Sequence, residues 1–429
     1  MCRALICLCL VIFAFCSAAS SRAADPPAKA LRFGKLVDGK GKVWTDAIVV
    51  VRGERIAEIT TDASKIPAGA DVIDLRRYTA IPGLIDVHTH ITYYWDQTSN
   101  VRPFDQQSGS RLPALTVFLA QENAQHTLEV GVTTVRDLGG NDWDDIAMRD
   151  LINRGSMTGP RMFVAGYGLY VADSPPRPGY ITPPGGRADN LGDVMRVIRE
   201  EIAAGVDVIK MYGSTGTDKD VTGFQTYTFD EMKAAAELAH KYGKRLAVHS
   251  YGPDGAKDAV RAGADSVEHA TDMDDATIAE MARRGTFYVP TIDHNRYYVD
   301  NYVAFGWTPA IADGLNDHIR RNFATAQRAF KAGVKFAMGS DALFTMCGQN
   351  TRELGWFVKL GMTPEQALAT ATTNAAALLG KEKELGALAP GYLADVVAVE
   401  GDPLADVNVT INNVRWVMKG GAVVVDKSK

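Results

Sequence analysis

The chain has 429 residues, of which 46% are hydrophobic and 23% charged, and its formal net charge is −5. These values are typical of a globular enzyme with one large domain or two modest ones. The acidic balance argues against a nucleic-acid partner and against a basic membrane-binding face. After residue 24 no apolar stretch approaches the length of a transmembrane helix, so we expect no stable membrane anchor.

Residues 1–24 are predicted to be a secretory signal peptide. Arg3 precedes an apolar run that ends at Phe15, and mostly small residues follow up to Ala24. A positive start, a short apolar middle and a small-residue end are the features of such a signal, which is removed on export. We therefore expect an exported protein, periplasmic or secreted. A lipid anchor on Cys16 is disfavoured, because Phe15 stands where a small residue is expected.

The predicted mature chain keeps a single cysteine. Four of the five cysteines lie in residues 1–24, which leaves Cys347 and excludes an intrachain disulfide. The same segment holds Arg3 and Arg22 but no acidic residue, so the mature chain has 44 basic and 51 acidic side chains and a net charge of −7. Stability must then come from packing or from metal binding.

Residues 25–80 and 386–429 are predicted to form one small β-sandwich domain. Short alternating segments rich in β-branched residues occur in both, as in Asp46–Arg52 and Val414–Val425. Neither end supplies enough strands for a domain of its own. The two ends of the chain are therefore expected to pair.

Residues 81–385 are predicted to form a (β/α)8 TIM barrel, an α/β fold. Amphipathic segments such as Phe229–Tyr242 and Asp274–Arg284 alternate with short apolar strands. Eight such units in about 300 residues are typical of this barrel. The strands are expected near 82–88, 132–137, 161–166, 206–211, 245–250, 265–270, 286–291 and 334–340.

The helix after the eighth strand carries its own start and stop signals. Thr363 can cap it, Pro364 suits its first position, and Gln366 completes a capping box. Gly380 follows its last apolar residues and is a stop signal. One helix between Thr363 and Gly380 is therefore predicted.

Candidate metal ligands stand at the ends of five of these strands. His88 and His90 point to one spot, because residues two apart in a strand share a face. TIM barrels place their reactive groups at the carboxyl ends of the strands, where side chains converge. A doubly wound sheet would spread those ends along a line. The other candidates, each at the end of a separate apolar run, are Lys210, His249, His269 and Asp341.

Several motifs resemble the amidohydrolase superfamily over essentially the whole mature chain. They are PGLIDVHTH at 82–90, GSDA at 339–342 and LAPGYLADVVAVEGDP at 388–403, together with Lys210, His249 and His269. The chain is similar to the imidazolonepropionase-like dipeptidases, a subgroup that includes Xaa-Pro dipeptidases (prolidases). Within this subgroup, VTTVRDLGG at 132–140 and HSYG at 249–252 resemble the ochratoxin-hydrolysing amidohydrolases.

The resemblance implies two divalent metal ions, bridged by Lys210 after CO2 has converted its amine to a carbamate. Zinc is the expected ion, because imidazole and carboxylate ligands with an open position suit hydrolytic zinc, and manganese or cobalt can substitute. By this resemblance His88, His90 and Asp341 hold the more buried ion, and His249 and His269 hold the other.

The chemistry of lysine agrees with a bridging carbamate at Lys210. A cationic lysine cannot bind a metal ion, whereas its carbamate offers two oxygen ligands. Lys210 follows Val208 and Ile209 and precedes Met211. Desolvation by such neighbours favours the neutral amine, which is the form that reacts with CO2.

The resemblance further implies an enzyme that hydrolyses the amide bond to a C-terminal amino acid. A metal-activated hydroxide would attack the amide, and Asp341 would take its proton and deliver it to the leaving amine. The expected substrates are Xaa-Pro and other dipeptides, N-acyl amino acids, and bulky aromatic amides such as ochratoxin A. Relatives often assemble, so a homo-oligomer is expected.

Three long loops rich in aromatic residues are expected to wall a deep, partly apolar pocket on the same face of the barrel. Tyr251, two residues beyond His249, is placed to donate to a substrate carboxylate or to a developing oxyanion. His294 and Arg296 are further candidates for binding a carboxylate. The loops are 91–113, 167–190 and 292–307.

One region departs from the subgroup, and two other functions stay open. Many members carry Gly-Gly-His after the third strand, where residues 165–178 read AGYGLYVADSPPRP without a histidine. The first alternative is a mononuclear cyclic amidohydrolase or deaminase of the imidazolonepropionase type, and Lys210 argues against it because one ion needs no bridge. The second is a non-catalytic barrel scaffold, which would have no use for so many ligating groups in one cavity.

Overall fold

The computed structural model describes residues 27–108, 111–171, 185–216 and 222–428. The predicted signal peptide and the middle of the predicted loop 167–190 lie outside the described residues. Among the residues that are described, no helix combines the length and the apolar character needed to cross a membrane.

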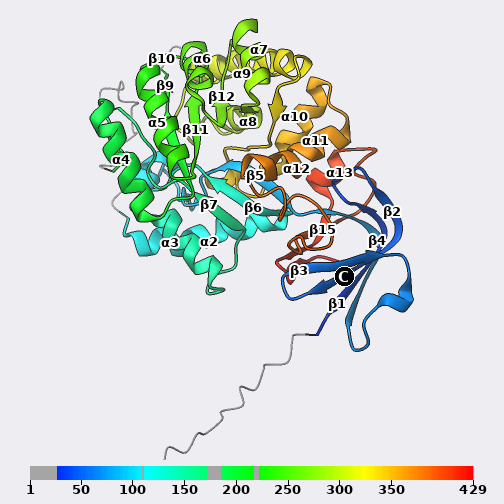
Figure 1. Ribbon diagram of the computed structural model, residues 1–429. Helices are drawn as coiled ribbons and strands as arrows, with labels where there is room; N and C mark the ends of the chain where they lie inside the picture. The colour runs from blue at the N-terminus through cyan, green and yellow to red at the C-terminus, as the bar shows by residue number, and fades with distance from the viewer. Residues whose placement is uncertain (1–26, 109–110, 172–184, 217–221, 429) are drawn as a thin grey trace, which may run out of the picture.

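Eight parallel strands form the barrel, and each falls on one of the predicted ranges (Figure 1). They are β5 (Leu84–Thr89), β6 (Val132–Asp137), β7 (Arg161–Val164), β8 (Val208–Tyr212), β11 (Arg245–Ser250), β12 (Ser266–His269), β13 (Phe287–Val289) and β14 (Lys335–Phe336). One sheet has the order β5-β6-β7 and a second has the order β8-β11-β12-β13-β14, and all neighbours are parallel.

Backbone hydrogen bonds between the two sheets close the barrel. Beside β7, the Leu169 N–H donates to the Lys210 carbonyl over 2.8 Å, and the Tyr212 N–H donates to the Leu169 carbonyl over 2.9 Å. On the other side, the Asp341 N–H donates to the His88 carbonyl over 2.7 Å. The eight strands therefore follow one another around a closed ring in chain order.

Helices cover the outside of this ring (Figure 1). Their apolar faces share one core with the strands, to which Leu128, Ile198 and Val260 belong. The helices are α1 (Pro103–Ser108), α2 (Pro113–Glu129), α3 (Asp144–Asn153), α4 (Leu191–Ala204), α5 (Phe229–Lys241), α6 (Pro253–Ala262), α7 (Asp275–Arg284), α8 (Ile292–Asp300), α9 (Pro309–Lys331), α10 (Glu353–Leu360), α11 (Pro364–Thr370), α12 (Thr373–Leu378) and α13 (Asn408–Asn412). Short elements are β9 (Ser214–Thr215), β10 (Phe224–Gln225), η1 (Ala63–Lys65), η2 (Phe344–Met346) and η3 (Asn350–Arg352).

The helix predicted between Thr363 and Gly380 begins as expected but is broken in two. The capping box of Thr363 and Gln366 is present at the start of α11. The break lies between Thr370 and Thr373. There the Thr370 carbonyl accepts from the Met338 N–H and the Ala371 carbonyl accepts from the Ile85 N–H, at 2.9 and 2.7 Å. These carbonyls bind barrel backbone instead of continuing the helix, a tertiary contact that local sequence signals do not contain.

Strands from both ends of the chain join in one seven-stranded sheet beside the barrel (Figure 1). Its strands are β1 (Lys29–Val37), β2 (Val43–Arg52), β3 (Arg55–Thr60), β4 (Asp71–Pro82), β15 (Val396–Val399), β16 (Val414–Lys419) and β17 (Ala422–Asp426), in the order β17-β16-β15-β4-β1-β2-β3. β15 pairs antiparallel with β4, which links the two ends. The strands enclose their own apolar core around Phe33, Leu75 and Trp416. The predicted barrel with a small β domain is therefore confirmed.

Candidate metal centre

The six predicted ligands lie at the carboxyl ends of the barrel strands. His88 is in β5 and His90 directly follows it, Lys210 is in β8, and His249 is in β11. His269 is the last residue of β12, and Asp341 follows β14. All are buried except His249, which is half-buried.

His88, His90 and Asp341 form the tightest group. One carboxylate oxygen of Asp341, Oδ1, lies 3.2 Å from Nε2 of His90 and 3.5 Å from Nε2 of His88. One ligand atom from each of the three residues lies within 4.8 Å of the other two, a spacing that could hold a metal ion. Two imidazoles and a carboxylate are a donor set that zinc and similar divalent ions accept.

The remaining predicted ligands adjoin this group. The ring centre of His269 lies 5.0 Å from that of His88, and the ring centre of His249 lies 4.5 Å from that of His269. The charge of Lys210 lowers the pKa of both His88 and His269, after the larger effect of burial. The structure therefore brings the six residues to one end of the barrel.

The amine of Lys210 is buried without a hydrogen-bond partner. Its Nζ is fully enclosed, and among the described residues none accepts a hydrogen bond from it. Burial lowers the pKa of Lys210 to about 8. A buried cation with no acceptor is costly, whereas the neutral amine can form a carbamate whose oxygens would face the histidines. The environment of Lys210 fits the expected bridging carbamate.

The electrostatics of the group favour a cation. Burial alone would raise the pKa of Asp341, but His294, His90 and Lys210 hold it below its ordinary value. Burial alone would lower the pKa of His90, yet the Asp341 carboxylate raises it above its ordinary value. Asp341 is therefore ionised and stabilises positive charge beside it. A bound metal ion would supply that positive charge in place of a proton.

The backbone is strained at two of the predicted ligands. His269 has φ of 72° and Asp341 has φ of 55°, values in the left-handed region that are uncommon for residues other than glycine. Such conformations cost about 1–3 kcal/mol each and are concentrated at functional sites. At the ends of the strands, these conformations turn both side chains toward the common centre.

Hydrogen bonds at Nδ1 hold the rings of three of the histidines. Nδ1 of His90 donates to the Gly139 carbonyl over 3.0 Å, and Nδ1 of His269 lies 2.6 Å from Oγ1 of Thr291. Nδ1 of His88 lies 2.8 Å from Oε2 of Glu268. Thr291 and Glu268 were missed by the sequence reasoning. The available signals were the position of Glu268 next to His269 and that of Thr291 shortly after β13.

Tyr251 and His294, predicted to bind substrate, lie beside the predicted ligands. The Tyr251 ring stacks on His269 at 4.6 Å between ring centres. Nε2 of His294 lies 3.2 Å from Oδ2 of Asp341, and its Nδ1 donates to the Asp341 carbonyl over 2.9 Å. Their contacts with a substrate stay predictions.

Arg296, the third predicted substrate contact, lies apart from this group. It is half-buried and forms an ion pair with Asp300, one turn further along α8. It lines a hollow of about 650 Å³ with Trp356 and Asn408, and none of the six predicted ligands lines that hollow. Its binding to a substrate carboxylate stays a prediction.

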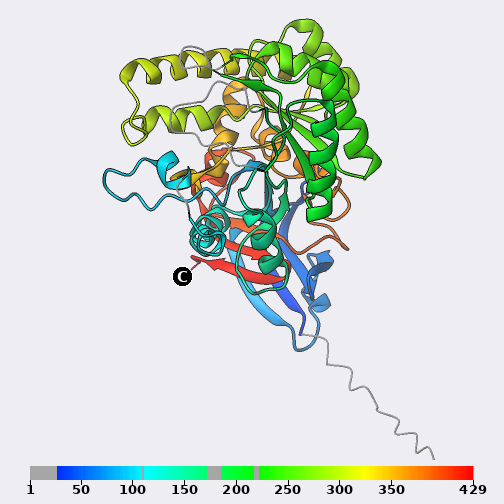
Figure 2. The same cartoon turned by 90° about the vertical axis from the view of Figure 1, so that its left-hand side faces the viewer.

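Aromatic side chains from two of the predicted loops pack together beside the centre. Phe104 in α1 lies 5.4 Å from Phe305 and 5.5 Å from Phe344 between ring centres. Tyr93 stacks on His90 at 4.9 Å and belongs to the same apolar cluster. Figure 2 shows α8 and α9 lying together above the segment that carries α1. Many of these aromatic rings therefore hold the loops to one another.

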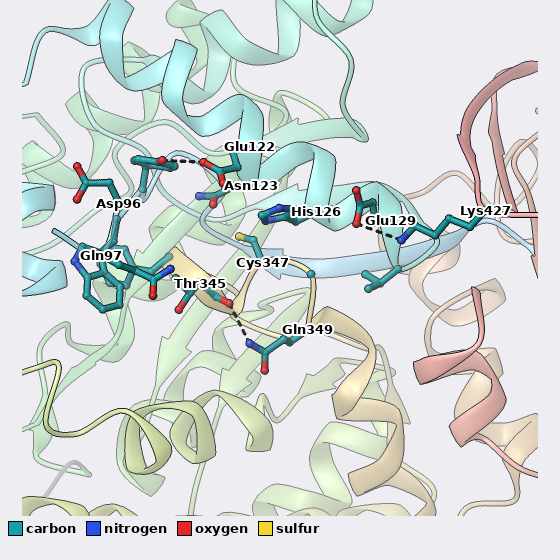
Figure 3. A pocket seen from close by; sticks show the side chains of 15 residues that line it. Asp96, Gln97, Glu122, Asn123, His126, Glu129, Thr345, Cys347, Gln349 and Lys427 are labelled. Atoms are coloured by element: carbon teal, nitrogen blue, oxygen red, sulfur yellow. Dashed lines mark hydrogen bonds and ion pairs between the residues drawn. The ribbon is translucent and has the colours of Figure 1, made fainter. Parts of the chain in front are cut away.

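A polar hollow of about 450 Å³ borders this aromatic cluster, since Trp95 and Phe344 line it (Figure 3). Its walls come from α2 and from the segments that follow β5 and β14, and they include Trp95, Glu122, His126 and Cys347. None of the six predicted ligands lines it. Burial raises the pKa of the Cys347 thiol far above its ordinary value, so this thiol is not an activated nucleophile.

Comparison with known proteins decides the family. The amidohydrolase family model matches residues 79–424, which include the whole barrel, β15 and β16, and parts of β4 and β17. The chain belongs to the amidohydrolase family. Its resemblance to that family, noted from the strand-end motifs, is confirmed.

Amidohydrolases of the expected subgroup are among the similar proteins. The chain is 30% identical over 426 residues to ochratoxinase of Aspergillus niger, with 90% of this chain and 85% of the relative covered. It is 25% identical over 423 residues to imidazolonepropionase of Geobacillus thermodenitrificans, with 91% of each covered. A crystal structure of a Xaa-Pro dipeptidase with bound methionine in the active site superposes with a TM-score of 0.83, at 30% identity over 92% of this chain and 99% of that one.

Proposed function

We propose that this amidohydrolase is a binuclear metal-dependent enzyme that cleaves the amide bond to a C-terminal amino acid. One observation carries the proposal: the six predicted ligands, at the ends of five strands, meet at one end of the barrel, and one of them is a buried amine without a hydrogen-bond partner among the described residues. A structural role for this arrangement is poorly supported, because burying ionisable groups without partners is unfavourable.

The predicted ligands divide into two sets around Lys210. His88, His90 and Asp341 would hold one ion, and His249 and His269 would hold the other, with the carbamate of Lys210 bound to both. When bound, the ions, for which zinc is our first choice, lower the pKa of a water molecule and polarise the scissile carbonyl.

Asp341 is the proposed general base and acid. Its carboxylate is ionised, since His294 and His90 lower its pKa against the effect of burial. It can therefore accept a proton from water during attack on the amide and deliver that proton to the leaving nitrogen. Nδ1 of His294 donates to the backbone carbonyl of Asp341 over 2.9 Å and restrains this residue.

The substrate class follows from the surroundings of the centre and from the relatives. Tyr251 lies against His269, where its hydroxyl could bind a substrate carboxylate or stabilise a developing oxyanion. Similar proteins are named ochratoxinase and Xaa-Pro dipeptidase, and both names are consistent with cleavage next to an amino acid. We infer that the substrates are dipeptides or N-acyl amino acids, including bulky aromatic amides such as ochratoxin A.

A screen of the mature, zinc-loaded protein tests the proposal. Xaa-Pro dipeptides, other dipeptides and N-acyl amino acids are incubated with the enzyme, and release of the free amine is measured. The matched control is each dipeptide with an amidated C-terminus, which keeps the scissile bond but removes the carboxylate. We expect hydrolysis of the free acids and at least a tenfold loss with the amides. Equal rates for both would contradict recognition of a C-terminal amino acid.

The same preparation separates the alternatives. A mononuclear cyclic amidohydrolase of the imidazolonepropionase type would bind one ion per chain and open a cyclic amide. A barrel scaffold would bind no metal and release no amine from any compound in the screen.

A further inference from the structure

A buried ion pair lies inside the barrel beneath the predicted metal ligands. Nη2 of Arg136, on β6, lies 2.9 Å from Oε1 of Glu268, on β12. Both residues are almost fully buried, with exposed fractions of 1% and 0%. The other two nitrogens of Arg136 also donate: Nε donates to the Val87 carbonyl over 2.5 Å, and Nη1 donates to Oγ of Ser266 over 3.0 Å.

Stability alone does not account for this pair. Two charges taken out of water lose several kcal/mol of solvation each, and apolar residues of similar volume are often as stable in such a place. The interior of a TIM barrel is usually filled with branched apolar side chains. The pair connects strands on different sides of the barrel, which points to a role in positioning side chains of the candidate site.

The second carboxylate oxygen of Glu268 contacts a predicted ligand. Oε2 lies 2.8 Å from Nδ1 of His88, while Nε2 of the same ring faces Oδ1 of Asp341 at 3.5 Å. A carboxylate only accepts hydrogen bonds, so it holds the ring proton on Nδ1. This leaves the lone pair of Nε2 directed toward the predicted metal.

The backbone at His269 allows Glu268 and His269 to serve the same centre. Consecutive residues in a regular strand point to opposite faces. His269 instead has φ of 72°, so its ring turns back toward the barrel end while Glu268 stays in the interior. β12 thus contributes a predicted ligand and, one residue earlier, the partner of another predicted ligand.

We propose that Glu268, held in place by Arg136, is a positioning residue that fixes the ring orientation and the tautomer of His88 for metal binding. The inference rests on the proposed function only in that His88 binds a metal ion. Residues that hold the outer nitrogen of a ligating histidine commonly contribute about 10–100-fold to metal affinity.

Glu268→Gln tests this role with almost no change in volume. Arg136 has donors only, so the glutamine oxygen is expected to face Arg136 and its NH2 group to face His88. That arrangement moves the ring proton of His88 to Nε2, the nitrogen that must bind the metal. We expect zinc affinity, measured on the metal-free protein by competition with a chelator, to fall by about 10–100-fold. The visible spectrum of the cobalt-loaded variant should also change.

A second, partly buried ion pair provides the control. Oδ2 of Asp395 lies 2.7 Å from Nη1 of Arg161, and no predicted ligand is part of that pair. Asp395→Asn should lower the melting temperature but leave zinc affinity and the cobalt spectrum at wild-type values. Equal loss of zinc affinity in both variants would show a general structural effect and overturn the inference.

The outcomes separate this inference from the proposed function. Wild-type zinc affinity in a folded Glu268→Gln variant would overturn the positioning role while leaving the proposed function intact. A wild-type protein that binds zinc but hydrolyses no amide would overturn the substrate class without affecting the positioning role. If Glu268→Gln does not fold, Glu268→Asp replaces it: the shorter carboxylate keeps its charge but withdraws from His88. Unchanged zinc affinity in that variant would also overturn the inference.

Discussion

Asp341, in the short GSDA segment, lies at the centre of the candidate site. Its carboxylate lies within 4.0 Å of ring nitrogens of four histidines, His88, His90, His269 and His294. Its backbone is in the left-handed region, which directs the side chain inward. One carboxylate is therefore available both to bind metal and to move a proton.

We predict that Asp341→Asn lowers kcat by about 10²–10⁴, the usual contribution of a general acid or base. Asparagine keeps the size of the side chain but cannot accept a proton from water at neutral pH. Steady-state kinetics on the best substrate of the screen measure the effect, and circular dichroism checks the fold. Asp274→Asn is the control, because asparagine is also a good N-cap for α7 and Asp274 is exposed, outside the group of predicted ligands. A turnover near wild type in Asp341→Asn would remove the proposed role.

Sequence alone predicted which side chains gather at the candidate site better than it predicted the residues that hold them in place. His88 and His90 are two apart in a strand, and Asp341 follows an apolar run, so strand periodicity places them. Glu268 was not predicted, because regular alternation would turn it away from its neighbour His269. The positive φ of His269 removes that conflict, and it is a feature of the tertiary structure.

At the scale of elements, local signals predicted where helices begin more reliably than where they end. The capping box at Thr363 is present, yet α11 stops at Thr370 because two carbonyls there bind barrel backbone. Capping depends on residues three apart, which the sequence shows directly. The break depends on strands that are distant along the chain.

We predict that Thr363→Ala lowers the free energy of unfolding by about 1 kcal/mol through loss of the α11 cap. Urea denaturation measures the change, and kcat should stay at the wild-type value because the cap supports packing outside the site. Thr363→Ser retains the hydroxyl and should recover most of the stability. A loss of activity without a loss of stability in Thr363→Ala would contradict this separation of roles.

The segment after β7 is held by a buried carboxyl group. Oε1 of Glu201, on α4, accepts a hydrogen bond from the Gly168 N–H over 3.2 Å. Gly168 has φ of +73°, and a Cβ there would lie 3.0 Å from Cγ of Lys210, so only glycine allows this close approach. Burial, with a contribution from Asp145, raises the pKa of Glu201 to about 8.

A pH-dependent stability follows from the raised pKa of Glu201. Between its ordinary pKa of 4.5 and the folded value of about 8, the folded chain keeps a proton that the unfolded chain releases. The free energy of unfolding therefore falls as pH rises through this window, by up to about 1.4 kcal/mol per pH unit from this group. We predict that Glu201→Gln reduces this slope, because the amide does not titrate. Urea denaturation from pH 5 to 8 measures it, and parallel curves for the two proteins would refute the prediction.

At the scale of the whole molecule, the fold was predictable from the alternation of strands and helices. Eight apolar segments separated by amphipathic ones indicate a barrel, and all eight strands form where expected. The pairing of β4 with β15 joins the chain ends, as their shared strand pattern indicated. The packing of the long aromatic loops could not be predicted, since it depends on contacts between segments such as α1 and α8.

Export and self-association concern the whole chain and stay proposals. A cleaved segment up to Ala24 would leave a mature protein with one cysteine, consistent with stability from packing and metal binding. Size-exclusion chromatography with light scattering gives the oligomeric state, and N-terminal sequencing of the exported protein gives the cleavage site.

The number of metal ions per chain, measured together with the carbamate, tests the central claim most directly. Wild-type protein is produced in cells grown with zinc and 13C-bicarbonate. Its metal content is measured by mass spectrometry, and the carbamate carbon is detected by NMR. We predict about two ions per chain and a carbamate signal that is absent from a folded Lys210→Arg variant, which should also lose metal. A folded wild-type protein with one ion or none, or with no carbamate that depends on Lys210, would contradict a binuclear centre bridged by this lysine.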